Sequence, residues 1–120
     1  MNGMKDDLTT LKFKNKEQAD TIAGILDFGV NLINPKDIKK LNKEMYEYAL
    51  KLTNELIYQQ DDEVIYLRDE EVLFVLDNTI WILNQELKEK KNPVYLNSIG
   101  LMKQLIELIN SKKEEVKNED

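Results

Sequence analysis

The side chains best suited to chemistry in this sequence are acids crowded into residues 61–71. Asp61, Asp62 and Glu63 are consecutive, and Asp69, Glu70 and Glu71 follow a few residues later. Hard cations such as Ca²⁺ bind to several carboxylates presented by one loop. This stretch has no turn glycine and no Asp-x-Asp-x-Asp-Gly pattern, and acids in the first turn of a helix explain the second group. We therefore expect a solvated acidic edge and no metal site.

Two residue types, histidine and cysteine, are missing altogether. Histidine is the usual general base near neutral pH, and cysteine supplies thiolate nucleophiles, zinc ligands and disulfides. Serine–histidine and cysteine–histidine catalysis are therefore excluded. Carboxylate, lysine or tyrosine chemistry stays open, but no motif points to it and no glycine-rich phosphate loop is present. We expect a protein that is not an enzyme, with no catalytic residue, cofactor or metal.

The strongest basic feature is a lysine cluster made of Lys36, Lys39, Lys40 and Lys43. At helical spacing these cations gather on the first two turns of a helix, which suits an acidic protein partner. Nucleic acid is disfavoured because the formal net charge is -6 and Arg68 is the only arginine. Recognition of bases and phosphates prefers arginine. A solvated helix face is the simpler interpretation of the cluster.

Aromatic residues supply a second candidate surface. Tyr46 lies opposite the apolar seam of its predicted helix, and Phe74 and Trp81 are two helical turns apart on another. Tryptophan and tyrosine are common at binding hot spots. We therefore join Tyr46, Phe74 and Trp81 to the lysine cluster as candidate protein-binding residues, with packing inside the chain as the alternative.

Apolar residues at three- and four-residue spacing predict four helices. The first covers residues 16–33, with Asn15 as its cap. Its Gly24 and Gly29 are either merely tolerated or let another helix approach closely. The second covers residues 35–59, begins at an Asn-Pro pair and carries a near-heptad apolar seam.

The third helix is expected over residues 70–90, with Asp69 as its cap. It is apolar nearly all round, which is typical of a helix at the centre of a fold or at a partner interface. Asp77 and Asn78 interrupt it and are expected to face solvent, with a buried position that fixes register or oligomeric state as the alternative. The fourth helix runs from about 93 to about 111.

Residues 9–14 and 64–67 are weak strand candidates. Each precedes a predicted helical hairpin, and residues 11–17 resemble residues 65–71 at an offset of 54, whereas the two Asn-Pro pairs are 58 residues apart. Internal duplication and chance recurrence of common caps both explain this alignment. In either case each hairpin leaves an apolar face exposed. The predicted fold is therefore all-α, a four-helix bundle built from two helical hairpins, with a short two-stranded β-ribbon if the strands pair.

A length of 120 residues suits one domain. We expect residues 1–120 to form a single helical domain with flexible ends at 1–8 and 112–120. No signal peptide opens the chain, and its longest apolar stretch is too short to span a bilayer, so the cytoplasm is the expected compartment.

By elimination, we expect a small acidic helical module that binds another protein of unknown identity. Inhibitor, immunity and phage accessory proteins are of this type. The first alternative is a structural homo-oligomer, as a dimeric bundle or an assembly chaperone. The second is a nucleic-acid-binding regulator.

Overall fold

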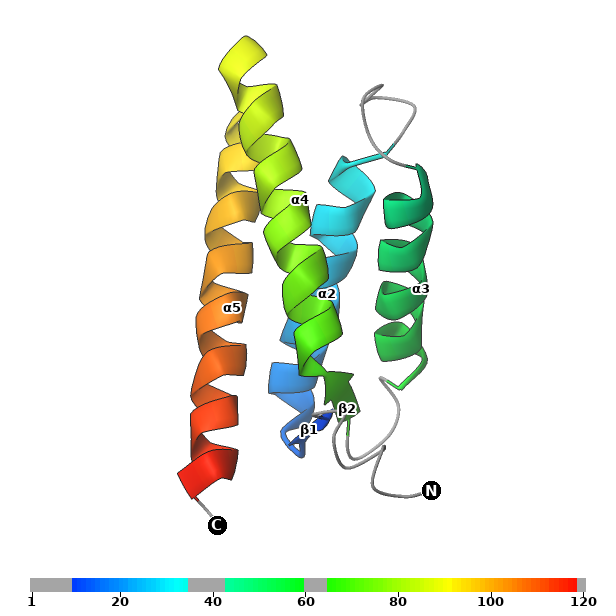
Figure 1. The fold of residues 1–120 in the computed structure, drawn as a ribbon, viewed down its shortest axis with the longest axis vertical. Helices are drawn as coiled ribbons and strands as arrows, with labels where there is room; N and C mark the ends of the chain where they lie inside the picture. Colours follow the sequence, from blue (N-terminus) through cyan, green and yellow to red (C-terminus); the bar gives the residue numbers. More distant parts are fainter. Residues whose placement is uncertain (1–9, 35–42, 60–64, 119–120) are drawn as a thin grey trace.

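The computed structural model describes residues 10–34, 43–59 and 65–118 and confirms the all-α bundle (Figure 1). Its elements are β1 (Thr10–Phe13), α2 (Lys16–Leu32), α3 (Lys43–Tyr58), β2 (Ile65–Arg68), α4 (Asp69–Glu89) and α5 (Pro93–Asn118). Successive helices run in opposite directions, so the bundle consists of two helical hairpins as predicted. None of the described helices is long and apolar enough to cross a membrane.

The two predicted strands do pair, as an antiparallel ribbon at the end of the bundle where α2 and α4 begin (Figure 1). Leu11 lies opposite Leu67, and Lys12 lies opposite Tyr66. Leu11, Phe13 and Leu67 are buried, whereas Lys12 is exposed. One face of the ribbon therefore closes the end of the core and the other faces solvent.

The central helix is α2 rather than α4. α2 contacts all three other helices and packs closely along α3 and α5, whereas α4 packs mainly along α5. Small residues allow this, because a Cβ added at Gly29 would lie only 2.7 Å from Sδ of Met102 on α5. Gly24 has open space around it. Close helix approach therefore explains Gly29, and simple tolerance explains Gly24. α3 and α4 touch least among neighbouring helices, so their side of the bundle is the most open.

The two halves of the chain bury equivalent positions. Eight buried residues of α2 and α3 each have a buried counterpart 53 positions later in α4 or α5. The pairs are Ala19/Val72, Ile22/Val75, Ala23/Leu76, Leu26/Thr79, Val30/Leu83, Ala49/Met102, Leu52/Leu105 and Leu56/Ile109. Two amphipathic hairpins that each bury one face also produce such a pattern, so the internal duplication stays a prediction.

The start of α4 differs from the prediction. Asn15 caps α2 as expected, and its side chain accepts a hydrogen bond from the N–H of Gln18. Asp69 does not cap α4, because β2 leads directly into the helix and Asp69 becomes its first residue. The cap position falls to Arg68, whose side chain makes no capping bond. The Asp69 side chain is instead buried and lies 3.4 Å from Nζ of Lys113.

The predicted end of α5 and the predicted start of α3 have different outcomes. α5 continues to Asn118 instead of ending near 111. Packing explains the extra turns, because Lys113 pairs with Asp69 and Lys112 lies 5.5 Å above the ring of Phe13. The described part of α3 begins at Lys43, and the predicted start near 35 lies outside the described residues.

Candidate functional site

Of the predicted lysine cluster, only Lys43 lies among the described residues. It is the first residue of α3 and is exposed. Lys36, Lys39 and Lys40 lie outside the described residues. The binding surface assigned to this cluster therefore stays a prediction.

Tyr46 does not face outward from α3. Its side chain is half-buried and packs against the hydrophobic core. Ala49 and Thr53 lie on the same side of the helix as Tyr46 and are fully buried. The buried face of α3 is therefore rotated about the helix axis relative to the predicted seam. The outward aromatic residue of α3 is Tyr58, which is 91% exposed. Binding by Tyr46 itself stays a prediction.

Phe74 and Trp81 both lie on the outward face of α4, where they are 53% and 62% exposed. The opposite side of the helix is in the core and carries Val75, Leu76 and Thr79. Asp77 lies between the two rings and is exposed as predicted, whereas Asn78 is half-buried. We call the outward row the aromatic strip; it consists of Glu70, Phe74, Asp77, Trp81, Asn84 and Lys88.

Phe74 makes one contact through its ring and another through its backbone. Its ring meets that of Tyr48 on α3 edge to face, with the ring centroids 6.3 Å apart. Its backbone carbonyl accepts a hydrogen bond from the Asn78 amide. The Tyr48 hydroxyl donates a 2.9 Å hydrogen bond to Glu71 on α4. Burial, followed by this bond to the Glu71 carboxylate, raises the pKa of Tyr48 above its usual value. Tyr48 therefore stays neutral under ordinary conditions and links α3 to α4.

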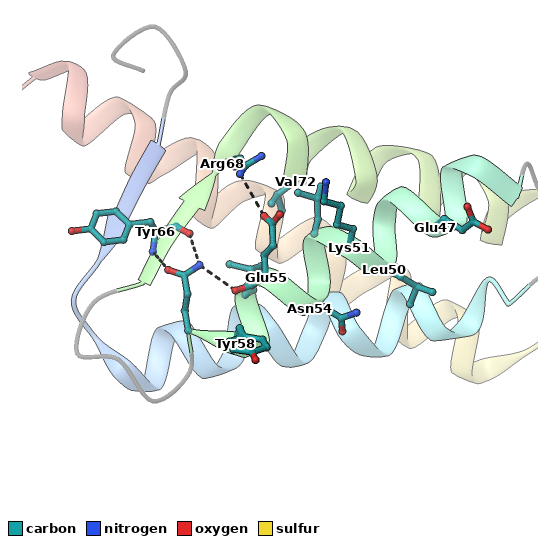
Figure 2. Close-up of a pocket in the computed structure, with 12 residues that line it drawn as sticks. Glu47, Leu50, Lys51, Asn54, Glu55, Tyr58, Tyr66, Arg68 and Val72 are labelled. Atoms are coloured by element: carbon teal, nitrogen blue, oxygen red, sulfur yellow. Dashed lines mark hydrogen bonds and ion pairs between the residues drawn. The ribbon is translucent and has the colours of Figure 1, made fainter. Parts of the chain in front are cut away.

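A groove of about 790 Å³ runs beside this link, between α3 and the junction of β2 with α4 (Figure 2). Buried Leu52, Leu56 and Val72 contribute to its lining. Its exposed residues include Lys51 and Tyr58 of α3. The groove therefore combines an apolar lining with a polar rim.

Arg68 ties the two walls of the groove together. Its guanidinium lies 3.2 Å from a carboxylate oxygen of Glu71 and 3.8 Å from one of Glu55. The hydrogen bond to Glu71 and the charge of Glu55 raise the pKa of Arg68, so it is always a cation. Exposed ion pairs of this kind are worth less than about 1 kcal/mol, and they orient α3 against α4 more than they stabilise the fold.

Sequence reasoning missed Gln59, at the end of α3. Its carboxamide accepts a hydrogen bond from the N–H of Tyr66 and donates one to the carbonyl of the same residue. No motif marks this role, because the bonds arise only once α3 ends beside β2. The lone arginine is conspicuous in the sequence, but nothing there pairs it with Glu55.

Within the described ranges, no three acidic side chains gather closely enough to hold a metal ion. Comparison with protein-family models, with curated proteins and with solved structures gave no match. Function must therefore be argued from the surfaces of this molecule.

Proposed function

We propose that this protein is a non-enzymatic protein-binding module and that the aromatic strip of α4 is its contact surface. The observation that carries the proposal is the exposure of Phe74 and Trp81, two turns apart on one helix face. Leaving large apolar side chains in water forgoes hydrophobic free energy that burial against a partner would supply, about 25 cal/mol per Å². Aromatic residues also dominate binding hot spots.

The strip is pre-organised for contact. It lies on a regular helix whose far side is in the core, and the ring of Tyr48 packs against that of Phe74. A rigid surface loses little conformational entropy on binding, so more of the contact energy appears as affinity.

The charges on the strip indicate the chemistry of the partner. Glu70 and Asp77 flank the rings, and the whole chain has a net charge of -6. A complementary surface offers an apolar pocket for Trp81 with lysine or arginine at its rim.

The test compares variants of the immobilised protein as bait in a lysate of the native host. We expect wild type and Tyr58→Ala to retain the same partner, and Trp81→Ala and Phe74→Ala to lose it. Tyr58→Ala is the matched control because it removes an even more exposed aromatic ring outside the strip. Circular dichroism checks that each variant is folded. Equal capture by all four proteins would contradict the proposal, and loss only with Lys39→Glu and Lys43→Glu would move the contact to the lysine cluster.

A homodimer through the same strip is the second candidate. Glu70 and Lys88 lie at opposite ends of the strip, so antiparallel packing of two α4 helices brings each acid near the lysine of the second copy. In this register Asp77 lies opposite Trp81 of the second copy and Phe74 lies opposite Asn84, so the rings do not pack on each other, which is why this candidate comes second.

Light scattering and Trp81 emission across a dilution series test the dimer. We expect Lys88→Glu to shift a dimer toward monomer and the added change Glu70→Lys to restore it. A monomeric mass at all concentrations would exclude this candidate and leave the binding of another protein untouched.

A further inference from the structure

The two strands of the ribbon differ in how their outer edges are covered. The outer edge of β2 is occupied by Gln59, whose carboxamide bonds to both the N–H (2.9 Å) and the C=O (3.1 Å) of Tyr66, as a neighbouring strand would (Figure 2). Such protection prevents unwanted strand pairing.

The position of Gln59 shows which way the backbone of β1 points. Because the N–H and C=O of Tyr66 face Gln59, they point away from β1. In an antiparallel pair the directly opposed residue behaves in the same way, so the N–H and C=O of Lys12 point away from β2. No residue in the described part of the chain hydrogen-bonds to these two groups. Among the residues that the structure describes, the outer edge of β1 is therefore unpaired at Lys12.

The helices beside the two outer edges carry different side chains, Gln59 after α3 and Lys112 on α5. Lys112 lies 53 positions after Gln59, within α5, which continues to Asn118. Its ammonium group lies above the ring of Phe13, and a lysine side chain has no acceptor with which to imitate a strand. The second half of the chain thus lacks the carboxamide that would close the edge of β1.

A basic hollow of about 560 Å³ lies beside this open edge. Its lining residues are Lys12, Lys14, Asn15, Gln18, Lys112, Glu115 and Val116. Three cations thus face one carboxylate on a chain that is acidic overall. A second copy of β1 paired antiparallel about Lys12 would place two lysines directly opposite each other, which is destabilising. A strand with an acidic residue opposite Lys12 would instead be stabilised by attraction between opposite charges.

We propose that the outer edge of β1 binds an extended acidic segment of another protein, which adds antiparallel to β1 as a third strand. The residue opposite Lys12 exchanges two backbone hydrogen bonds with it and carries its side chain on the same, outer face. That residue is an acid. The alternate residues point to the inner face, where the buried Leu11 and Phe13 of β1 favour apolar side chains. The segment therefore alternates acidic and apolar residues. This edge is separate from the aromatic strip and does not depend on the function proposed for it.

The test uses a blocked synthetic peptide of alternating glutamate and valine, titrated into the ¹⁵N-labelled full-length protein. We expect saturable shifts of the β1 amides and slower hydrogen exchange of the Lys12 N–H. N-methylation of the glutamates should abolish binding, because their N–H groups face Lys12, whereas N-methylation of the valines should not. Absence of binding, or equal loss with either methylated peptide, would overturn the proposal.

Charge variants supply the second arm. Lys12→Glu with Lys14→Glu should weaken the peptide on the order of tenfold, since attraction becomes repulsion across the strand pair. Lys90→Glu with Lys91→Glu makes the same change in net charge at the far end of the bundle and should leave affinity nearly unchanged. Equal losses in the two double variants would reduce the binding to general electrostatics and refute a site at β1.

Discussion

At the scale of single residues, the buried polar side chains have the largest energetic consequences. The hydroxyl of Thr79 is buried in α4 and has no hydrogen-bond partner in the described part of the chain. The hydroxyl of Thr53 in α3 is equally buried but donates a 2.8 Å bond to the carbonyl of Ala49. A satisfied hydroxyl and an unsatisfied one have opposite effects on stability, because an unpaired buried polar group carries its full desolvation penalty.

We therefore expect Thr79→Val to raise the free energy of unfolding by about 1 kcal/mol. Valine keeps the shape of the side chain and removes the unpaired oxygen. Thr53→Val is the matched control and should give no such gain. Urea denaturation of the three proteins measures the effect, and a loss of stability in the Thr79 variant would show that its hydroxyl is satisfied.

The buried Asp69–Lys113 pair yields a second prediction. Lys113→Met should lower the free energy of unfolding by about 3 kcal/mol, because it leaves a buried carboxylate without its counter-ion. Adding Asp69→Asn should recover most of this loss. Lys16→Met, which breaks the exposed pair with Asp20, is the control and should change stability by less than about 0.5 kcal/mol. If the double variant is as unstable as Lys113→Met alone, the unpaired charge of Asp69 is not the cause of the lost stability.

At the scale of elements, the close approach of α2 to α5 organises the bundle. Gly29 faces Met102 and Ser98 across this contact, whereas Gly24, on the same helix, faces open space. Both glycines lower the stability of the helix relative to alanine by a similar amount. They differ in the atoms that an added side chain would contact. The missing side chain at Gly29 thus lets α2 approach α5 closely.

The same substitution should consequently have opposite signs at the two positions. Gly24→Ala should stabilise the protein by up to about 1 kcal/mol through helix propensity. Gly29→Ala should destabilise it by about 1–3 kcal/mol, because Met102 is fully buried and must move to admit a methyl group. Thermal unfolding monitored by circular dichroism compares them. Stabilisation in both variants would mean that the Met102 side chain on α5 moves aside at little cost in free energy.

At the scale of the whole molecule, the weak contact between α3 and α4 distinguishes this bundle. Tyr48 and Arg68 connect the two helices on their open side. The groove and the ring of Phe74 border this connection. Loss of the Tyr48 contact would therefore loosen the side of the molecule that carries the proposed binding surface.

This contact predicts a pH dependence at the alkaline end. The pKa of Tyr48 is raised above 10.0, so the native state favours the neutral phenol more than the unfolded state does. Its contribution to stability is complete below pH 10.0 and is lost as pH rises through the raised pKa. Tyr48→Phe should lower stability at neutral pH and flatten this alkaline decline. Urea midpoints measured from neutral pH to above 10.0 test it, and parallel curves for both proteins would contradict it.

The helices and the ribbon follow from the sequence because they depend on local signals. Apolar spacing placed α2 and α4 nearly at their observed ends, and a cap residue marked the start of α2. The exposure of Phe74 and Trp81 was predictable because the other apolar residues of α4 are enough to form its buried face. These properties are set within one or two helical turns, where side-chain periodicity decides which face is buried.

Other features were decided only by the tertiary structure. Asp69 is an ordinary cap in the sequence and becomes a buried ion because β2 meets α4 without a spacer and brings it to Lys113. Tyr46 turned inward because the packing of α3 on α2 set its rotation. Gln59 closes one strand edge, and Lys112 leaves the other open, through contacts between residues far apart in the chain. Periodicity determines which residues of an element are apolar, but the neighbours that each side chain meets depend on how the elements pack.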